Sequence, residues 1–351
     1  MTFCRHPIAL DGMGGDHAPR VPVDAALAAA RAGVPIALVG PEDILRPALK
    51  GATDRVPSNL EIVHAPEVIH MAEAPSQAAR RKRDSSIAVA FRLVNDGKAS
   101  AMVSAGNSGA VMAAGLFEGG RIPGVQRPAL AAAAPTKKDP VLVLDLGANT
   151  EPSPAQMAQF ALMGSAYAKA ALHRQRPRIG LLTNGTEEGK GTELTQKTDE
   201  LLRGLDLNYA GYCEGGDLFE GDLDVVVVDG YTGNVTLKVV EGFMKAIAAF
   251  IETEVRKSVI TMAGSLFMRR LIPAAKKRLD HEAAGGAPLL GLRPNAIVAH
   301  GASSVRALGH ALRAAQALAD CDITRAIEME IAAHPSLFAP HRSPNAASDE
   351  R

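Results

Sequence analysis

Cysteine and the usual metal-binding spacings are scarce in this sequence. The 351 residues include three cysteines, Cys4, Cys213 and Cys321, which are too far apart to form a C-x-x-C pair. The 10 histidines include no H-E-x-x-H motif. We therefore expect free thiols in a reducing compartment, no metal site and no cofactor.

Net charge is also absent, because 38 lysines and arginines balance 38 aspartates and glutamates. Such a chain has no overall field to recruit nucleic acid or a membrane, so a charged partner must meet a local patch. No stretch reaches the ~20 uninterrupted apolar residues of a membrane-spanning helix. The few residues before the loop at Asp11 leave no room for a signal peptide. We expect a cytoplasmic protein with no nucleic-acid partner.

A repeated order of strand, glycine loop and helix is what the sequence does contain. The plainest case is the apolar run Asp224–Val228, typical of a strand buried on both faces, followed by Asp229-Gly-Tyr-Thr-Gly-Asn-Val-Thr-Leu-Lys238. Glycine accompanies Asp, Asn, Lys or His at the ends of six strands, in residues 11–19, 104–110, 145–151, 184–191, 229–238 and 300–304. Loops of one parallel sheet meet at its carboxyl edge, where helix N-termini offer free N–H groups. We predict a single shared cleft suited to phosphate.

The same order predicts an α/β fold with a mostly parallel sheet. The 47% of hydrophobic residues are enough for a large core. We expect one catalytic domain over residues 1–334 and a protruding amphipathic helical segment at about 240–285. Residues 335–351, rich in Pro, Ser, Asn and charge, are expected to form a disordered tail.

Three common catalytic or nucleotide-binding motifs match this sequence in part, and each fails at one required position. The dinucleotide fingerprint needs glycine where His17 stands, and the G-x-S-x-G elbow around Ser108 ends in Ala110. A Walker A loop fails because Gly191 follows Lys190. Without a nucleotide motif or a credible nucleophile, the loops favour direct attack by a bound anion on a bound electrophile, catalysed by positioning and oxyanion stabilisation.

Several segments have an ordinary structural interpretation as well as a functional one. The basic run Arg80–Arg83 is either a solvated face or a contact for phosphate or an acidic carrier. Residues 259–278 combine an apolar tip with a basic collar, which suits an anionic bilayer interface, a dimer contact or a core helix. Asp229 is either a helix cap or a ligand-binding group, and His300 is either a general base or a structural residue.

The loops resemble those of the PlsX family, the bacterial phosphate acyltransferases of phospholipid synthesis, in order over nearly the whole chain. The matching motifs are Leu10-Asp-Gly-Met-Gly-Gly-Asp-His-Ala-Pro19, Ser104-Ala-Gly-Asn-Ser-Gly-Ala110, Leu144-Asp-Leu-Gly-Ala-Asn149, Thr186-Glu-Glu-Gly-Lys-Gly191, Asp229–Lys238, Gly286-Ala-Pro-Leu-Leu-Gly291 and His300-Gly301.

The resemblance implies transfer of a fatty acyl group from acyl carrier protein to inorganic phosphate. The product, an acyl phosphate, would serve a membrane glycerol-3-phosphate acyltransferase. Family members have a three-layer α/β/α fold similar to that of isocitrate and isopropylmalate dehydrogenases. They pair as homodimers and associate peripherally with the membrane, so the same is expected here.

Loop chemistry and resemblance together define the candidate residues. The catalytic candidates are Lys190, Asp229, Asn234, Lys238 and His300. The phosphate and substrate candidates are Asp11, Gly14, Gly15, Asp16, Asn107, Ser108, Gly109, Asn149, Gly189 and Gly233. Carrier contacts are expected at Arg80, Arg81, Lys82 and Arg83, and membrane contacts at Ile260, Leu266, Phe267 and Leu271.

Two rival functions remain open from the sequence. An NAD-dependent hydroxy-acid dehydrogenase or an acetyl-type phosphotransferase on the same fold would use a similar cleft, although the dinucleotide fingerprint is missing. A non-catalytic membrane adaptor would account for residues 259–278 and would not need the polar loops.

Overall fold

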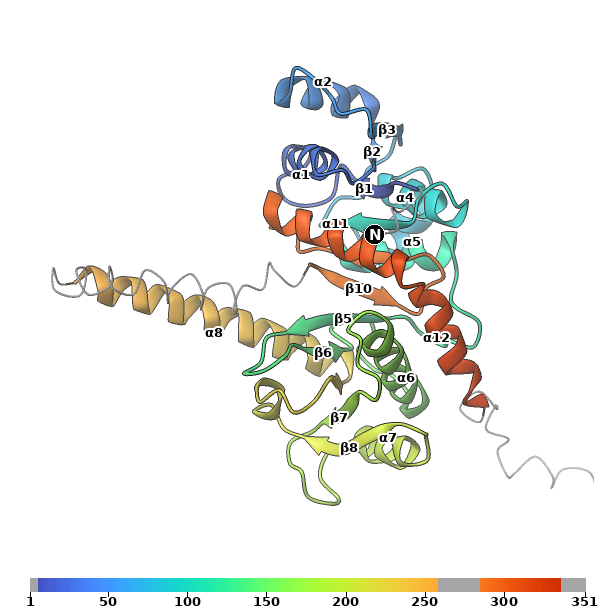
Figure 1. The fold of residues 1–351 in the computed structure, drawn as a ribbon, viewed down its shortest axis with the longest axis vertical. Coiled ribbons are helices and arrows are strands. Elements are labelled where there is room, and N and C mark those ends of the chain that lie inside the picture. Colours follow the sequence, from blue (N-terminus) through green and yellow to red (C-terminus); the bar gives the residue numbers. More distant parts are fainter. Residues whose placement is uncertain (1–5, 258–284, 336–351) are drawn as a thin grey trace, which may run out of the picture.

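The computed structural model describes residues 6–257 and 285–335, and in them it shows an α/β protein built on one 11-stranded sheet (Figure 1). The strands are β1 (Ile8–Asp11), β2 (Ile36–Gly40), β3 (Leu60–His64), β4 (Ala101–Ser104), β5 (Ala129–Ala134), β6 (Val141–Leu144), β7 (Arg178–Leu182), β8 (Asn208–Cys213), β9 (Val225–Val227), β10 (Ala287–Leu290) and β11 (Ala296–Val298). Most pairings are parallel, which confirms the predicted fold class.

Helices cover both faces of this sheet and complete a three-layer α/β/α arrangement. One layer contains α1 (Arg20–Arg31), α2 (Glu42–Ala52), α6 (Pro154–Ala170), α7 (Glu193–Arg203), α11 (Val305–Asp320) and α12 (Ile323–Ala332). The other contains α3 (Pro75–Arg81), α4 (Ser86–Asn95), α5 (Ser108–Glu118) and the base of α8 (Gly230–Arg256). Strands β1, β2, β4, β6, β9 and β11 are buried on both faces because both helical layers pack on them.

The direction of the strands reverses in the middle of the sheet, whose order is β3-β2-β1-β4-β11-β10-β5-β6-β9-β7-β8. The strands β3, β2, β1, β4 and β11 are parallel to one another, and we call them with their helices the first half. The strands β6, β9, β7 and β8 form the second half. Antiparallel pairings of β11 with β10, β10 with β5 and β5 with β6 separate the halves. The two halves therefore run in opposite directions.

Helix α8 extends away from the two halves (Figure 1). The carboxylate of Asp229 accepts a hydrogen bond from the Thr232 N–H at 2.9 Å and so caps its first turn. Beyond this anchored base, large apolar side chains stay exposed, as shown by the 63% exposure of Phe243. The remainder of the predicted protruding segment, residues 258–284, lies outside the described residues.

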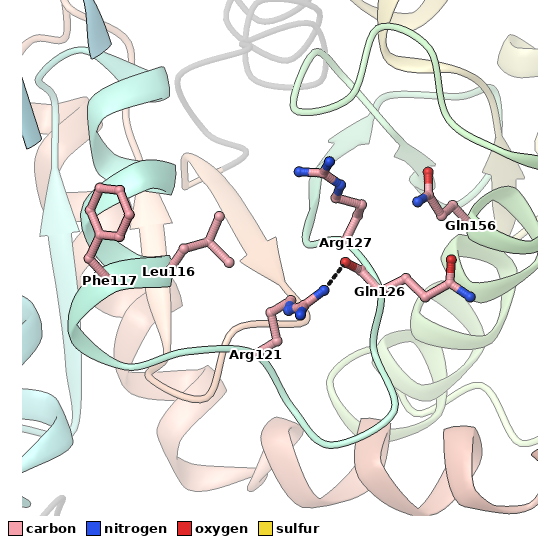
Figure 2. A pocket seen from close by; sticks show the side chains of 6 residues that line it. All are labelled: Leu116, Phe117, Arg121, Gln126, Arg127 and Gln156. Atoms are coloured by element: carbon pink, nitrogen blue, oxygen red, sulfur yellow. Dashed lines mark hydrogen bonds between the residues drawn. The ribbon is translucent and has the colours of Figure 1, made fainter. Parts of the chain in front are cut away.

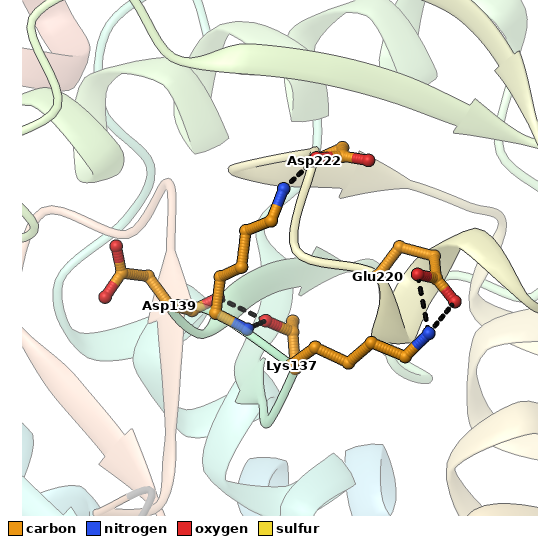
Figure 3. A network of polar contacts seen from close by, with 6 residues as sticks. Lys137, Asp139, Glu220 and Asp222 are labelled. Carbon is orange, nitrogen blue, oxygen red and sulfur yellow. Dashed lines mark hydrogen bonds and ion pairs between the residues drawn. The ribbon is translucent and has the colours of Figure 1, made fainter.

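Exposed ion pairs link the segment after β5 to the segment that leads into β9 (Figure 3). Lys137 pairs with Glu220 at 2.6 Å, and Lys138 pairs with Asp222. Exposed pairs of this kind each contribute little stability, at most about 1 kcal/mol. They therefore join two exposed segments beside the second half and add little to its stability.

Some elements differ from what the sequence pattern suggests. β5 is a run of alanines with one leucine, a composition that favours helix, and it is a strand because it pairs with β6 and β10. The segment Ala287–Leu290, which lies between the glycines of the motif Gly286–Gly291 and contains a proline, is strand β10. The basic run after Ala74 begins as the short helix α3, with Pro75 in its first turn.

Candidate active site

Three loops of the first half gather where β1, β4 and β11 end, and we call them the glycine-loop cluster: residues 11–16, 104–109 and 300–304. The Asp16 N–H donates to the Gly301 carbonyl at 2.8 Å, which joins the first loop to the last. A Cβ added to Gly14 would lie 2.6 Å from Asp11 Oδ2 and 2.8 Å from the Gly106 nitrogen. Only glycine allows the loops to approach this closely.

Asp11 is the buried polar centre of the glycine-loop cluster, with 1% exposure. Its Oδ2 accepts the Ser104 hydroxyl at 2.7 Å, and Ser104 Oγ in turn accepts the Gly106 N–H at 3.0 Å. Its Oδ1 accepts the Met13 N–H at 3.0 Å. Burial raises the pKa of Asp11, and the hydrogen bonds from Ser104 and from backbone amides oppose that rise. Asp11 therefore positions the loops through these hydrogen bonds and is too buried to contact a substrate directly.

The more exposed members of the glycine-loop cluster are Asp16, Ser108 and His300. The Nδ1 atom of His300 accepts the Ala302 N–H at 3.1 Å, which leaves its Nε2 side for a ligand. Ser108 opens α5, whose first turn points free N–H groups beyond the sheet. These groups suit a bound oxyanion.

Both polar atoms of the Asn107 side chain form hydrogen bonds within the protein. Its Oδ1 caps α5 by accepting the Ala110 N–H at 3.1 Å. Its Nδ2 donates to the carbonyls of Met71 at 3.0 Å and Glu73 at 3.2 Å. The Asn107 amide group therefore uses its donors within the protein, so the predicted substrate contact through this side chain is not favoured.

A second group of predicted residues, the Asp145 cluster, lies where β6 and β9 end and comprises residues 145–149 and 229–234. Asp145 accepts hydrogen bonds from the Leu130 N–H at 2.9 Å and from the Asn149 N–H at 2.6 Å. Burial raises the pKa of Asp145, and those hydrogen bonds oppose the rise. The Asn149 amide group donates to the Pro128 carbonyl at 2.7 Å, and the Asn149 carbonyl accepts the Gly230 N–H at 2.8 Å.

The start of α8 packs tightly on the Asp145 cluster. A Cβ on Gly233 would lie 2.0 Å from the Asp145 carbonyl oxygen, so the two backbones are in direct contact. Asn234 lies over Gly147, and Lys238 follows about one helical turn later with an exposed side chain. Asp229 has the structural role of an N-cap.

Lys190 and Gly189 lie in the exposed loop after β7, also in the second half. The Lys190 ammonium is 3.9 Å from the Glu187 carboxylate, and its side chain is 48% exposed. Gly189 has a φ of 86°, which favours glycine. The lysine is thus held only loosely by a weak surface pair.

The prediction that all the glycine loops share one edge of a parallel sheet is wrong. The pairings of β10 and β5 reverse the strand direction, so the carboxyl ends of the second half lie on the edge where the first half begins. Within one chain, the glycine-loop cluster and the Asp145 cluster are therefore separate groups. The sequence does not reveal this reversal because neither β5 nor β10 carries a clear strand signal.

The basic run is only partly available to a partner. Lys82 is tied to the fold, since its ammonium donates to the Val68 carbonyl at 2.7 Å and pairs with Glu73 at 2.6 Å. Arg80, Arg81 and Arg83 remain exposed. The predicted membrane contacts Ile260, Leu266, Phe267 and Leu271 lie outside the described residues.

A cavity of about 590 Å³ lies between the end of α5 and the start of α6 (Figure 2). It is lined by Leu116, Phe117, Arg121, Gln126, Arg127 and Gln156. The cavity adjoins the Asp145 cluster, because Pro128 follows Arg127 and accepts the Asn149 amide. Neither arginine belongs to a recognisable motif, and their loop lacks the glycine pattern found at the strand ends, so no signal in the sequence marks them as functional candidates.

Metal-binding clusters and membrane-spanning helices are both missing from residues 6–257 and 285–335. No group of three or more His, Cys, Asp or Glu residues in those ranges is arranged to hold a metal ion. No helix in the same ranges is long and apolar enough to cross a membrane.

Comparison with known structures places the fold among phosphotransacylases and dehydrogenases. The EutD phosphotransacetylase of Staphylococcus aureus gives a TM-score of 0.59 at 18% identity, over 90% of this chain and 95% of that chain. The phosphotransacetylase of Streptococcus pyogenes gives 0.61 at 18% identity, over 90% and 94%. A 4-hydroxythreonine-4-phosphate dehydrogenase of Klebsiella pneumoniae gives 0.53 at 16% identity, over 90% and 99%. At these identities the likeness concerns the fold alone.

Sequence relatives are much more similar. The protein named phosphate acyltransferase in Trichlorobacter lovleyi is 46% identical over 336 residues, covering 95% of this chain and 96% of the relative. Its namesake in Myxococcus xanthus is 47% identical over 330 residues, covering 91% and 93%. The profile of the family described as fatty acid synthesis protein matches residues 7–326. The chain belongs to this family, the PlsX phosphate acyltransferases.

Proposed function

We propose that this protein transfers a fatty acyl group from acyl carrier protein to inorganic phosphate and releases an acyl phosphate. The observation that carries the proposal is the glycine-loop cluster, in which close-packed glycine loops and the N-terminus of α5 meet above the buried Asp11. Family membership and relatives named phosphate acyltransferase support the same reaction.

In the proposed mechanism, phosphate binds at the glycine-loop cluster and attacks the thioester carbonyl directly. A phosphate oxygen forms the new bond to the acyl carbon, and the carrier thiolate leaves with the bonding electrons and takes up a proton. The N–H groups at the start of α5 and at Gly15 bind the charged oxygens, whereas the Gly14 N–H already donates to the Asp11 carboxylate. Phosphate already has an ionised oxygen at neutral pH, so the Nε2 side of His300 needs only to orient it.

The rival functions are less consistent with this site. A dehydrogenase would need a nicotinamide-binding loop, and the β1 loop has His17 where the fingerprint requires glycine. A membrane adaptor would not need a buried carboxylate that organises glycine loops.

Incubation of the purified protein with palmitoyl-carrier protein and inorganic phosphate tests the reaction. We expect free carrier thiol and acyl phosphate to appear together and only when phosphate is present. Thiol release without acyl phosphate would identify a thioesterase. No release of either product would contradict the proposed function.

The lysines proposed as counter-charges for phosphate come from the second half, whose loops lie at the opposite edge of the sheet from the glycine-loop cluster of the same chain. They are therefore proposed to reach the phosphate from the other copy of a homodimer. Replacement of Lys190 by alanine is expected to lower turnover at least tenfold, because a hydrogen bond to a charged group is worth about 1.5–3 kcal/mol. Lys238→Ala tests the corresponding role on α8. The measurement is the phosphate dependence of turnover, and Lys197→Ala, on the surface of α7, is the control. Near-normal kinetics would remove the lysine in question from the mechanism.

A homodimer is proposed to form through α8. Its exposed apolar side chains recur every four residues, at Tyr231, Val235, Val239, Phe243, Ile247 and Ile251, with Phe250 beside the last. Such a row matches the ridge that packs against the same ridge of a second helix. An apolar surface of this length is unusual on a monomer.

The double substitution Phe243→Glu and Phe250→Glu is expected to convert the dimer to a monomer. Each new carboxylate would lose its hydration in an apolar contact. Sedimentation analysis checks the result, and Met329→Glu, at a 62% exposed position on α12, is the control. A wild-type protein that sediments as a monomer, or a double variant that stays dimeric, would contradict the assignment.

Peripheral membrane association through residues 259–272 is proposed from sequence and family resemblance. The composition of this segment, apolar with neighbouring lysines and arginines, supports it. Sedimentation with anionic vesicles tests it, and loss of binding on replacing Leu266 and Phe267 by glutamate is expected. If the variant binds the vesicles as well as the wild type does, Leu266 and Phe267 do not contribute to membrane association. Proximity to a glycerol-3-phosphate acyltransferase is part of the same proposal.

A further inference from the structure

We infer that the cavity between α5 and α6 receives the phosphodiester end of the pantetheine arm that carries the acyl thioester, with Arg121 and Arg127 as its anion-binding residues. This inference rests on the proposed function and adds where the donor substrate binds. The volume of about 590 Å³ is typical of sites for sizeable organic ligands and exceeds what inorganic phosphate needs.

The walls of the cavity differ in chemistry, as Figure 2 shows. Leu116 and Phe117 come from the last turn of α5, and Phe117 is 50% exposed. Arg121 and Arg127 lie on the connection to β5, opposite that apolar wall. An apolar surface facing two guanidinium groups suits a ligand with an anionic group joined to a less polar chain.

The loop that carries both arginines is held in place by its own backbone. The Ile122 N–H donates to the Gly291 carbonyl at 3.0 Å, and the Arg293 N–H donates to the Gly120 carbonyl at 3.1 Å. The amide of fully buried Gln159 accepts the Gln126 N–H at 2.8 Å and donates to the Gly124 carbonyl at 3.1 Å. A fixed loop loses little conformational freedom when a ligand binds.

Both arginines keep binding capacity for an anion. Arg121 donates to the Gln126 carbonyl, and neither Arg121 nor Arg127 forms an ion pair with an acidic residue in the described part of the chain. No direct contact with a carboxylate there compensates their positive charges. A phosphodiester can accept the remaining N–H groups in bidentate fashion.

The distance from the cavity to the glycine-loop cluster matches the length of the arm. Helix α5 has 11 residues, so its two ends are about 16 Å apart at 1.5 Å per residue. An extended pantetheine arm has about as many chain bonds as four to five residues, which gives roughly 16 Å. Ser108, Met112 and Leu116 follow one another at intervals of four on α5 and are at least partly exposed. They form a track from the cluster to the cavity.

The surface beside the cavity fits an acidic protein that delivers the arm. Helix α3 lies along α5, and the guanidinium of Arg80 is 5.8 Å from the centre of the Phe117 ring. Arg81 and Arg83 continue this exposed basic surface from α3. A carrier bound there would place its arm at the cavity mouth, whereas coenzyme A, which has the same arm, would use the cavity without the basic surface.

Steady-state kinetics of Arg121→Gln and Arg127→Gln test the inference, with Arg176→Gln, an exposed arginine just before β7, as the control. We expect KM for acyl-carrier protein to rise about tenfold in each cavity variant, the loss of one hydrogen bond to a charged group. KM for phosphate is expected to stay within about twofold. KM for acyl-coenzyme A is expected to rise by the same factor in the cavity variants. The double variant Arg81→Gln with Arg83→Gln is expected to raise KM for acyl-carrier protein and to leave KM for acyl-coenzyme A unchanged.

Wild-type turnover separates failure of this inference from failure of the proposed function. A wild-type protein that makes no acyl phosphate would contradict the function itself. With an active wild type, cavity variants that behave like Arg176→Gln would overturn the inference, as would variants that lower kcat and leave the donor KM unchanged. Binding of the non-acylated carrier, measured by fluorescence anisotropy, provides a readout independent of turnover, and unchanged affinity in both variants would overturn it as well.

Discussion

Asp11→Ala is expected to lower kcat/KM for phosphate about a hundredfold, the scale of loss that follows when catalytic groups are displaced by about 1 Å. The substitution removes the acceptor of the Ser104 hydroxyl at 2.7 Å and of the Met13 N–H at 3.0 Å. Ser104 in turn positions the Gly106 N–H. Because Asp11 has 1% exposure, the expected effect arises from misplacement of the loops and not from loss of a substrate contact.

Comparison with two further variants makes the positioning role testable. Asp11→Asn keeps an oxygen for the backbone amides and changes the bond to Ser104, so partial rescue of KM for phosphate is expected. Asp206→Ala, at an exposed position in the loop before β8, is the matched control and should behave as wild type. Phosphate kinetics and circular dichroism are measured on the same samples. If folded Asp11→Ala keeps its wild-type KM and kcat, the glycine-loop cluster is not the phosphate site.

Gly233→Ala is expected to destabilise the protein by about 3 kcal/mol, the upper end of the usual cost of overpacking. The new Cβ would lie 2.0 Å from the Asp145 carbonyl oxygen and 3.0 Å from a Val228 methyl group. Neither backbone can yield easily, because Asp145 accepts several amide hydrogen bonds and α8 starts at Gly230. Urea unfolding monitored by circular dichroism checks the prediction.

A second glycine of α8 provides a control in which the same substitution is expected to increase the free energy of unfolding. At Gly242 an added Cβ would meet no atom of the described residues within 4 Å, so Gly242→Ala should stabilise α8 by about 0.5–1 kcal/mol through helix propensity alone. Equal unfolding midpoints for the two alanine variants would contradict the close contact between α8 and the loop after β6. A stable Gly233→Ala protein with normal hydrogen exchange at the base of α8 would contradict it too.

Much of the first half could be predicted from the sequence because its signals are local. β1, β2 and β4 are short apolar runs with a glycine at or close after their ends, and Ser85, a favourable capping residue, caps α4. The capping box that begins α6 at Ser153 is equally local. Strands and caps of this kind are determined by residues a few positions apart in the sequence, so they can be predicted without knowledge of the tertiary structure.

The arrangement of the site could not be predicted because it depends on distant pairings. The polyalanine composition of β5 gives no strand signal, and its pairing with β6 and β10 determines that the halves run in opposite directions. The role of Asn107 in binding the Met71 and Glu73 carbonyls also requires a segment more than 30 residues earlier. The residue types in the loops indicated which side chains are candidates. Which of the loops lie together in space depends on the strand pairings and could not be predicted.

The pairing of β11 with β4 has a consequence for biosynthesis. Ala296 lies opposite Met102 in the register, so one edge of β4 has no partner until nearly 200 residues of later chain have left the ribosome. The N-terminal half of the nascent chain therefore exposes an apolar strand edge during most of translation, a surface that invites aggregation. Chaperones that bind extended apolar segments are expected to associate with ribosome-bound chains that end before residue 296 and to dissociate once α11 has emerged.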